Sequence, residues 1–237
     1  MIDWLRRLLG RAEPAPAFDA PLRHPRREDE VSAVEAALTG LLAAGIRLGP
    51  HLRDLSLREV ARGMAEHPEF AVGDEADGDL TLQAPNALAI DILWSYRSLA
   101  DGIEDEFANA TMFSDHCYDG AEPETYTDLF RRLVTLGAWT CRDVTATPVP
   151  DLGPYGHGFR IAFAAEPPIP PVTFPADKDF DWALLAPLNA SLPAAEPRRL
   201  WVAADGGTAL VVFLTDAEAR GVETCLGFGP GALGAPA

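Results

Sequence analysis

The chain has 237 residues, of which 48% are hydrophobic and 23% charged, a composition typical of globular proteins and unlike disordered, collagen-like or coiled-coil chains. Its formal net charge of −17 opposes contact with nucleic-acid phosphates, so neither DNA nor RNA is expected as a partner. The basic residues are 18 Arg and one Lys, a bias that favours a GC-rich, bacterial genome.

The cysteine content predicts a reducing compartment. Cys117, Cys141 and Cys225 are odd in number and show no CxxC spacing, which argues against a disulfide framework or a zinc ribbon. Free thiols fit the cytoplasm. No apolar run approaches the ~20 residues of a transmembrane helix, and no secretory signal follows Arg6 and Arg7. We therefore expect a cytoplasmic protein without a transmembrane segment.

The N-terminal segment is predicted to be a tethered piece. Residues 1–11 have the pattern of a short amphipathic helix with a basic face, and residues 12–27 form a proline-rich linker. Such a helix can lie on an anionic membrane surface, and the alternative is that it packs on its own domain.

The folded body is predicted to cover residues 28–225, with a subdivision near residue 120 left open and a flexible tail over 226–237. Apolar residues at helical spacing predict a helix over 31–42, ending before Gly45. Ser56 and Glu59 form a capping box, which predicts a second helix over 57–66.

The next region is harder to interpret. Residues 70–72 and 80–82 flank a turn rich in Gly and Asp, which predicts a hairpin. Two helices followed by a hairpin suggest a winged helix, but this wing is acidic, and its negative charge would repel the phosphates of DNA. Residues 87–97 alternate like a strand and also repeat like a helix, and their β-branched and aromatic content favours the strand.

The C-terminal part gives clearer patterns. We predict a helix ending at Gly137, strands over 138–147 and 158–165, a rigid connector over 166–175, a short helix from Asp181 to about 190, strands over 199–204 and 208–214, and a last helix opened by the capping box Thr215–Glu218. A helix–strand–strand order therefore recurs, and short connections imply antiparallel hairpins. The predicted fold class is α+β, with antiparallel hairpins and helices packed on one face.

The acidic residues are concentrated in the middle of the chain. Residues 63–130 contain sixteen acidic side chains and a single basic one, Arg97. One interpretation is a solvated surface that maintains solubility; the other is a docking face for a basic protein. The candidate partner-binding residues are Asp101, Glu104, Asp105, Glu106, Asp115, Asp119, Glu122 and Glu124.

A thiol-dependent catalytic site is an alternative. Cys117 is the candidate nucleophile, His157 in a glycine-rich loop is the candidate base, and Asp143 is the candidate acid that orients the base. The acidic residues around Cys117 oppose thiolate formation, and nothing in the sequence requires the three residues to meet.

The sequence predicts no metal site and no cofactor. The side chains at 115–119 are too close in sequence to converge on zinc. Asp177, Asp179 and Asp181 are typical of the start of a calcium loop, but Trp182 occupies the position that requires Gly, and no Glu closes the loop.

Three functions follow as hypotheses. The leading one is a non-catalytic, acidic binder of a basic protein partner, similar in profile to small inhibitor or immunity proteins. The second is a thiol-dependent hydrolase using Cys117 and His157. The third is an accessory protein that contacts the membrane surface through residues 2–11.

Overall fold

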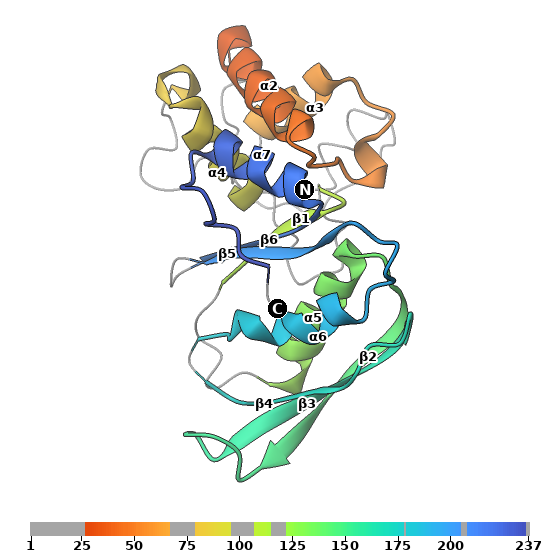
Figure 1. Ribbon diagram of the computed structural model, residues 1–237. Helices are drawn as coiled ribbons and strands as arrows, with labels where there is room; N and C mark the ends of the chain where they lie inside the picture. The colour runs from red at the N-terminus through yellow and green to blue at the C-terminus, as the bar shows by residue number, and fades with distance from the viewer. Residues whose placement is uncertain are drawn as a thin grey trace, which may run out of the picture. The chain divides into compact units, whose positions relative to one another are not determined.

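The computed structural model describes residues 27–66, 79–95, 107–114, 122–177, 179–204 and 208–235 (Figure 1). Within these ranges the fold is α+β with antiparallel sheets, as predicted. The chain divides into two compact units. Unit 1 comprises residues up to Ala108 together with Cys225–Gly227, and unit 2 comprises Asn109–Thr224 and Phe228–Ala237. The sequence had left a subdivision near residue 120 open. The predicted N-terminal helix, and the linker apart from Arg27, lie outside the described residues.

Unit 1 is helical in its described part. Helices α3 and α4 and the 3-10 turn η3 pack against α2. The elements are α2 (Glu28–Ala43), η1 (Pro50–Leu52), α3 (Leu57–Glu66), η3 (Leu80–Leu82) and α4 (Pro85–Ser95). The predicted capping box opens α3: the Glu59 carboxylate accepts from the Ser56 N–H at 2.7 Å, and the Ser56 hydroxyl accepts from the Glu59 N–H at 3.3 Å.

Two strand predictions in unit 1 are wrong. Residues 80–82 form the 3-10 turn η3, because Asp79 accepts the Thr81 N–H and caps the turn; residues 70–72, the other predicted arm, lie outside the described residues. Residues 85–95 form α4, so of the two alternatives given for 87–97 the favoured strand is wrong and the helix is correct over the described part. Pro85 occupies the first turn, and the buried residues Leu88, Ala89, Ile92 and Leu93 recur four apart on the face that meets the core.

Unit 2 contains both sheets. One has the strand order β1–β6–β5 and the other the order β2–β3–β4, and all neighbouring strands are antiparallel. Figure 1 shows α5 and α6 between the two sheets, and residues from both sheets and both helices share one hydrophobic core. The elements are β1 (Ala110–Ser114), α5 (Pro123–Leu136), β2 (Thr140–Pro150), β3 (His157–Glu166), β4 (Val172–Pro175), η4 (Trp182–Leu185), α6 (Ala186–Ala190), β5 (Arg199–Ala204), β6 (Thr208–Leu214) and α7 (Asp216–Leu226), of which the last two residues of α7 belong to unit 1.

The helix–strand–strand order is present twice in unit 2, as α5–β2–β3 and as α6–β5–β6. The third predicted instance, over 56–83, is absent from the described residues because η3 replaces its strand. The predicted connector over 166–175 is also corrected: its last four residues form β4, which pairs with β3 and turns the hairpin into a three-stranded sheet.

The sequence predicted a flexible tail over 226–237, but its described residues, up to Ala235, make specific contacts. Leu233 is buried, and its N–H donates to the buried Glu223 carboxylate at 2.9 Å. Gly234 and Val202 exchange two backbone hydrogen bonds of 2.9 Å, so the segment covers part of the open edge of β5. A composition of Gly, Ala and Pro concealed these contacts because each depends on a distant partner.

Prolines mark the open edge of β2. The Asp151 N–H donates to the Gly156 carbonyl at 3.0 Å, which places Asp151 among the residues whose backbone groups face β3. Backbone direction alternates along an antiparallel strand, so the nitrogens of Pro148 and Pro150 face the open edge. Proline has no N–H to offer there, and this part of the edge cannot pair fully with another strand.

Candidate functional site

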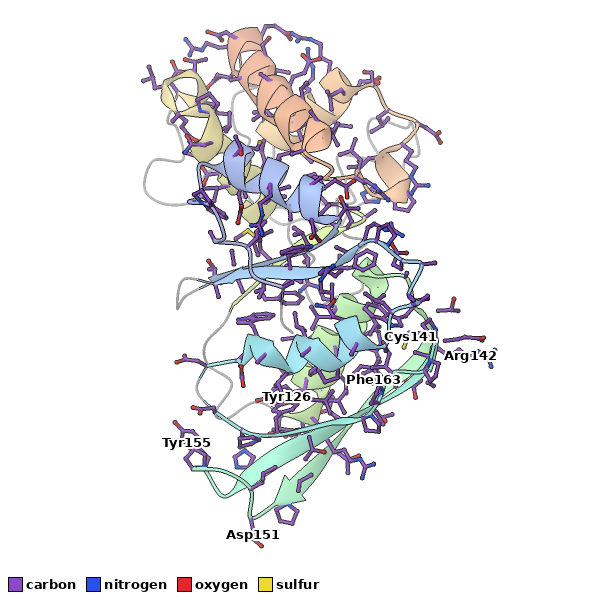
Figure 2. The ribbon with its side chains drawn as sticks, viewed as in Figure 1. Tyr126, Cys141, Arg142, Asp151, Tyr155 and Phe163 are labelled. Carbon is purple, nitrogen blue, oxygen red and sulfur yellow. The ribbon has the colours of Figure 1, made fainter. Side chains whose placement is uncertain are left out.

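The predicted catalytic triad is not assembled by the described residues. Cys117 lies outside them. Asp143 pairs with Ala164 and His157 pairs with Pro150, so the two side chains lie seven positions apart along the hairpin, roughly 24 Å. Figure 2 shows these two ends: Cys141 and Arg142 lie at one, and Asp151 and Tyr155 at the other. Asp143 therefore cannot orient the His157 ring.

His157 has structural contacts of its own. Its Nδ1 lies 3.1 Å from the Tyr155 carbonyl oxygen, and its ring meets the Phe159 ring edge-on with centroids 5.9 Å apart. Neither of the two described cysteines is hydrogen-bonded to a general base. The Cys141 thiol donates to the Asp143 carbonyl at 3.3 Å, and burial raises the pKa of the Cys225 thiol, which disfavours the thiolate.

Most of the predicted partner-binding acids cannot be placed. Asp101, Glu104, Asp105, Glu106, Asp115 and Asp119 lie outside the described residues. Glu122 and Glu124 are described, and both are exposed at the start of α5. The docking face therefore stays a prediction, with its only described members at the N-terminal end of this helix.

A second group of acids lies on the segment that follows β3. From Pro171 to Trp182, exposed and buried residues alternate, with Lys178 outside the described residues. Because side chains of an extended chain point alternately to opposite faces, this period places Phe174 and Phe180 in the core and Asp177, Asp179 and Asp181 outside it. The same period generates an apolar row and an acidic row.

These two rows meet at a pocket of about 290 Å³ in unit 2. The pocket is lined by Tyr126, Phe174, Pro175, Asp177, Asp179, Phe180, Asp181 and Leu184. Tyr126 comes from the first turn of α5, Leu184 comes from η4, and the other residues come from β4 and the segment leading to η4. The rings are packed against one another, with centroid distances of 5.3 Å for Tyr126–Phe174 and 6.2 Å for Phe174–Phe180.

The loop of the β2–β3 hairpin adjoins this pocket. Gly153 has φ of +74°, and a Cβ at this position would lie 2.2 Å from the Cβ of Pro175, which lines the pocket. The loop also carries Tyr155, whose side chain is 47% exposed (Figure 2). A large exposed aromatic side chain beside acidic residues is typical of an interface anchor.

The charge of the pocket is negative at its rim. Asp181 accepts the Ala183 N–H at 2.9 Å, which orients its carboxylate and caps η4 as predicted. Neither Asp179 nor Asp181 forms a salt bridge with another described residue. Lys178, the only lysine, lies between Asp177 and Asp179 in the sequence but outside the described residues.

The aspartate row does not form a metal centre. Alternate side chains of an extended chain are separated by roughly 6–7 Å, whereas calcium requires six or more oxygens at about 2.4 Å. Among the described residues, no group of three or more His, Cys, Asp or Glu side chains is arranged to hold a metal ion. Separate carboxylates around an aromatic pocket instead suit an organic cation, which carries several donors and an apolar stem.

The sequence contained a signal for this site. The alternation in Val172–Trp182 is visible in the printed sequence, and it predicts three aspartates on one face of an extended segment. Comparison with calcium loops drew attention to the same aspartates, and the loop was rejected because of Trp182 and the missing Glu. The contributions of Tyr126 and of the hairpin loop depend on tertiary contacts and had no signal in the sequence.

Similarity to known proteins does not indicate what the pocket binds. Comparisons of the chain with protein-family models, curated proteins and solved structures found no match. None of the helices in the described ranges combines the length and apolar character needed to cross a bilayer. The chemistry of the lining residues is therefore the basis for assigning a ligand.

Proposed function

We propose that the chain is a non-catalytic, cytoplasmic protein that binds a basic protein partner, in the manner of a small inhibitor or immunity protein. The observation that carries the proposal is the pocket of unit 2, whose lining combines Asp177, Asp179 and Asp181 with aromatic and apolar residues. A cationic side chain of the partner would find both carboxylate acceptors and an apolar wall there.

The charge of the whole chain supports the same partner. A net charge of −17 attracts a basic protein over distances of about a Debye length, ~8–10 Å at physiological salt, and so accelerates encounter. Glu122 and Glu124 are exposed on the helix that also supplies Tyr126 to the pocket. Long-range electrostatic steering and the acidic pocket therefore both favour a positively charged partner.

The test is capture of the partner from host lysate by three forms of the protein. The first is wild type. The second is the pocket variant, which combines Asp177→Asn, Asp179→Asn and Asp181→Asn. Asparagine at 181 retains the ability to cap η4, so the local fold is preserved. The third is a matched control, which combines Asp143→Asn, Glu166→Gln and Asp216→Asn. It changes the net charge by the same amount at exposed positions that do not line the pocket.

We expect wild type and control to retain one stoichiometric basic protein that elutes with salt. The pocket variant should retain it with affinity lower by at least about tenfold, because a charge pair at a partly desolvated contact contributes ~1.4 kcal/mol or more. Equal losses in the two variants would mean that only net charge matters. Equal retention by all three forms, or an eluate without a basic partner, would refute the proposal.

A further inference from the structure

The size of the pocket limits its occupant. A volume of about 290 Å³ lies at the lower end of the range for ligand sites, roughly 300–1,000 Å³, so it suits one side chain better than a nucleotide or a larger metabolite. Its lining combines three buried rings, of Tyr126, Phe174 and Phe180, with carboxylates at the rim. The occupant must therefore present a cation at the end of an apolar stem.

We infer that the pocket binds the side chain of an arginine of the basic partner, a specificity that rests on the proposed function. A guanidinium group is planar and weakly hydrated, so it enters a pocket with apolar walls at a lower cost in lost hydration than an ammonium group. Its five N–H donors reach two carboxylates at once, whereas the three donors of lysine surround a single point charge. Asp179 and Asp181 lie two positions apart on the outward side of the extended segment, roughly 6–7 Å, a spacing that suits the wider guanidinium group.

The sheet edge next to the pocket argues against main-chain recognition. The Ala176 N–H donates to the His157 carbonyl at 3.0 Å, so alternation directs the backbone groups of Thr173 and Pro175 to the open edge of β4. Pro175, and Pro171 just before the strand, have no N–H to donate. A strand of the partner could pair with little more than Thr173, and affinity must come from side chains.

The hairpin loop supplies a second contact for the same partner. Tyr155 is 47% exposed on the loop whose Gly153 packs on Pro175, so an aromatic surface lies close to the pocket wall. Arginine and tyrosine are both enriched among binding hot spots, so a partner that places an arginine in the pocket can also contact Tyr155 on the neighbouring loop. The partner residue flanking the arginine would then be one that packs on a tyrosine ring.

The experiment compares three blocked amino acids: N-acetyl-arginine methylamide, the lysine analogue and the citrulline analogue. Citrulline keeps the shape of arginine without its charge. Each is titrated into the full-length protein at low salt and followed by amide chemical shifts in ¹⁵N-labelled protein. The variants are Asp179→Asn and, as a matched control at the far end of the hairpin, Asp143→Asn, whose amide oxygen can still accept the Val144 N–H.

We expect the arginine analogue to shift the signals of residues 174–184 with millimolar affinity, at least about fivefold tighter than the lysine analogue, and citrulline to produce no shift. Asp179→Asn should weaken arginine binding by about fivefold or more, and Asp143→Asn should leave it unchanged. Equal binding of arginine and lysine, or shifts scattered over the acidic surface, would overturn the inference.

The two proposals fail separately. If the pocket variant loses the captured partner but the arginine analogue does not bind, the proposed function stands and the arginine specificity falls. If the arginine analogue binds but capture is insensitive to the pocket, the specificity stands and the proposed function falls.

Discussion

Replacing Gly153 by alanine tests whether the hairpin loop supports the pocket wall. Gly153 and Gly156 lie in the same loop and have nearly equal left-handed φ angles, +74° and +72°. They differ in their surroundings: a Cβ at 153 would lie 2.2 Å from the Pro175 Cβ, whereas a Cβ at 156 would meet nothing within 4 Å. The pair therefore separates backbone strain from contact with the pocket wall.

The expected costs follow from these geometries. An alanine in the left-handed region costs about 1–2 kcal/mol, and both variants carry this term. Gly153→Ala adds a carbon–carbon contact far inside the optimum of about 3.5–4.0 Å, and such overpacking costs about 1–3 kcal/mol. We therefore expect Gly153→Ala to lower the free energy of unfolding of unit 2 by about 1–3 kcal/mol more than Gly156→Ala.

The assay is urea denaturation followed by tryptophan fluorescence, combined with titration of the arginine analogue into each variant. Displacement of Pro175 should also weaken the arginine site in Gly153→Ala while leaving it intact in Gly156→Ala. If the two variants differ in stability by less than about 0.5 kcal/mol, the loop does not pack on Pro175, and the inference that the loop adjoins the pocket is refuted.

Three further predictions concern the scaffold and the open edge. Glu223→Ala should destabilise unit 2 by about 1–3 kcal/mol in urea denaturation, because it leaves the buried Leu233 N–H unpaired. The control Asp216→Ala, at an exposed position, should cost about 0.5 kcal/mol or less. Equal costs would contradict the buried contact. Pro148→Thr combined with Pro150→Thr should increase the mass measured by light scattering, since both substitutions restore N–H donors to an open edge that can then pair with another strand. A mass equal to that of wild type would count against the edge assignment. Hydrogen bonds from the Thr81 hydroxyl and then from Arg27 lower the pKa of Asp79 to about 2. The contribution of Asp79 to stability should therefore be complete above pH 3.8, the ordinary pKa of the group, and be lost as the pH falls towards 2. A titration of this carboxyl by NMR with a midpoint near 3.8 would exclude this.

Sequence reasoning succeeded where an element is determined by its own residues. The capping boxes at Ser56 and Thr215 predicted the starts of α3 and α7, and the structure contains their reciprocal hydrogen bonds, such as the Thr215 N–H to the Glu218 carboxylate at 2.9 Å. Both partners of each box lie within four residues, so no distant contact can override them. Four strands of unit 2, β2, β3, β5 and β6, were predicted for the same reason, from local alternation and turn residues, whereas β1 and β4 were not predicted.

The errors occurred where distant residues decide the structure. Asp79 is bound by Arg27, and the Leu80 N–H donates to the buried Glu30 carboxylate at 3.3 Å, so α2 organises η3 from fifty positions away. In α4 the β-branched and aromatic residues favoured a strand locally, but burial against α2 selects the helical face that contains Leu88 and Ile92. In both cases, contacts with distant residues determined the structure against the preference of the local sequence.

The alternation over 171–182 explains why the site and the core can be tested separately although they share one segment. Phe174 and Phe180 point into the core, and truncating either ring would cost about 3–5 kcal/mol. The aspartates between and beside them are exposed, so exchanging them for asparagine should change the free energy of unfolding by about 0.5 kcal/mol or less. Loss of partner binding in the pocket variant therefore reports on recognition, because the residues that hold the segment in place are untouched. The same period explains how sequence change could alter the partner without altering the fold: the outward positions set the charge of the pocket rim, and the inward positions set its floor.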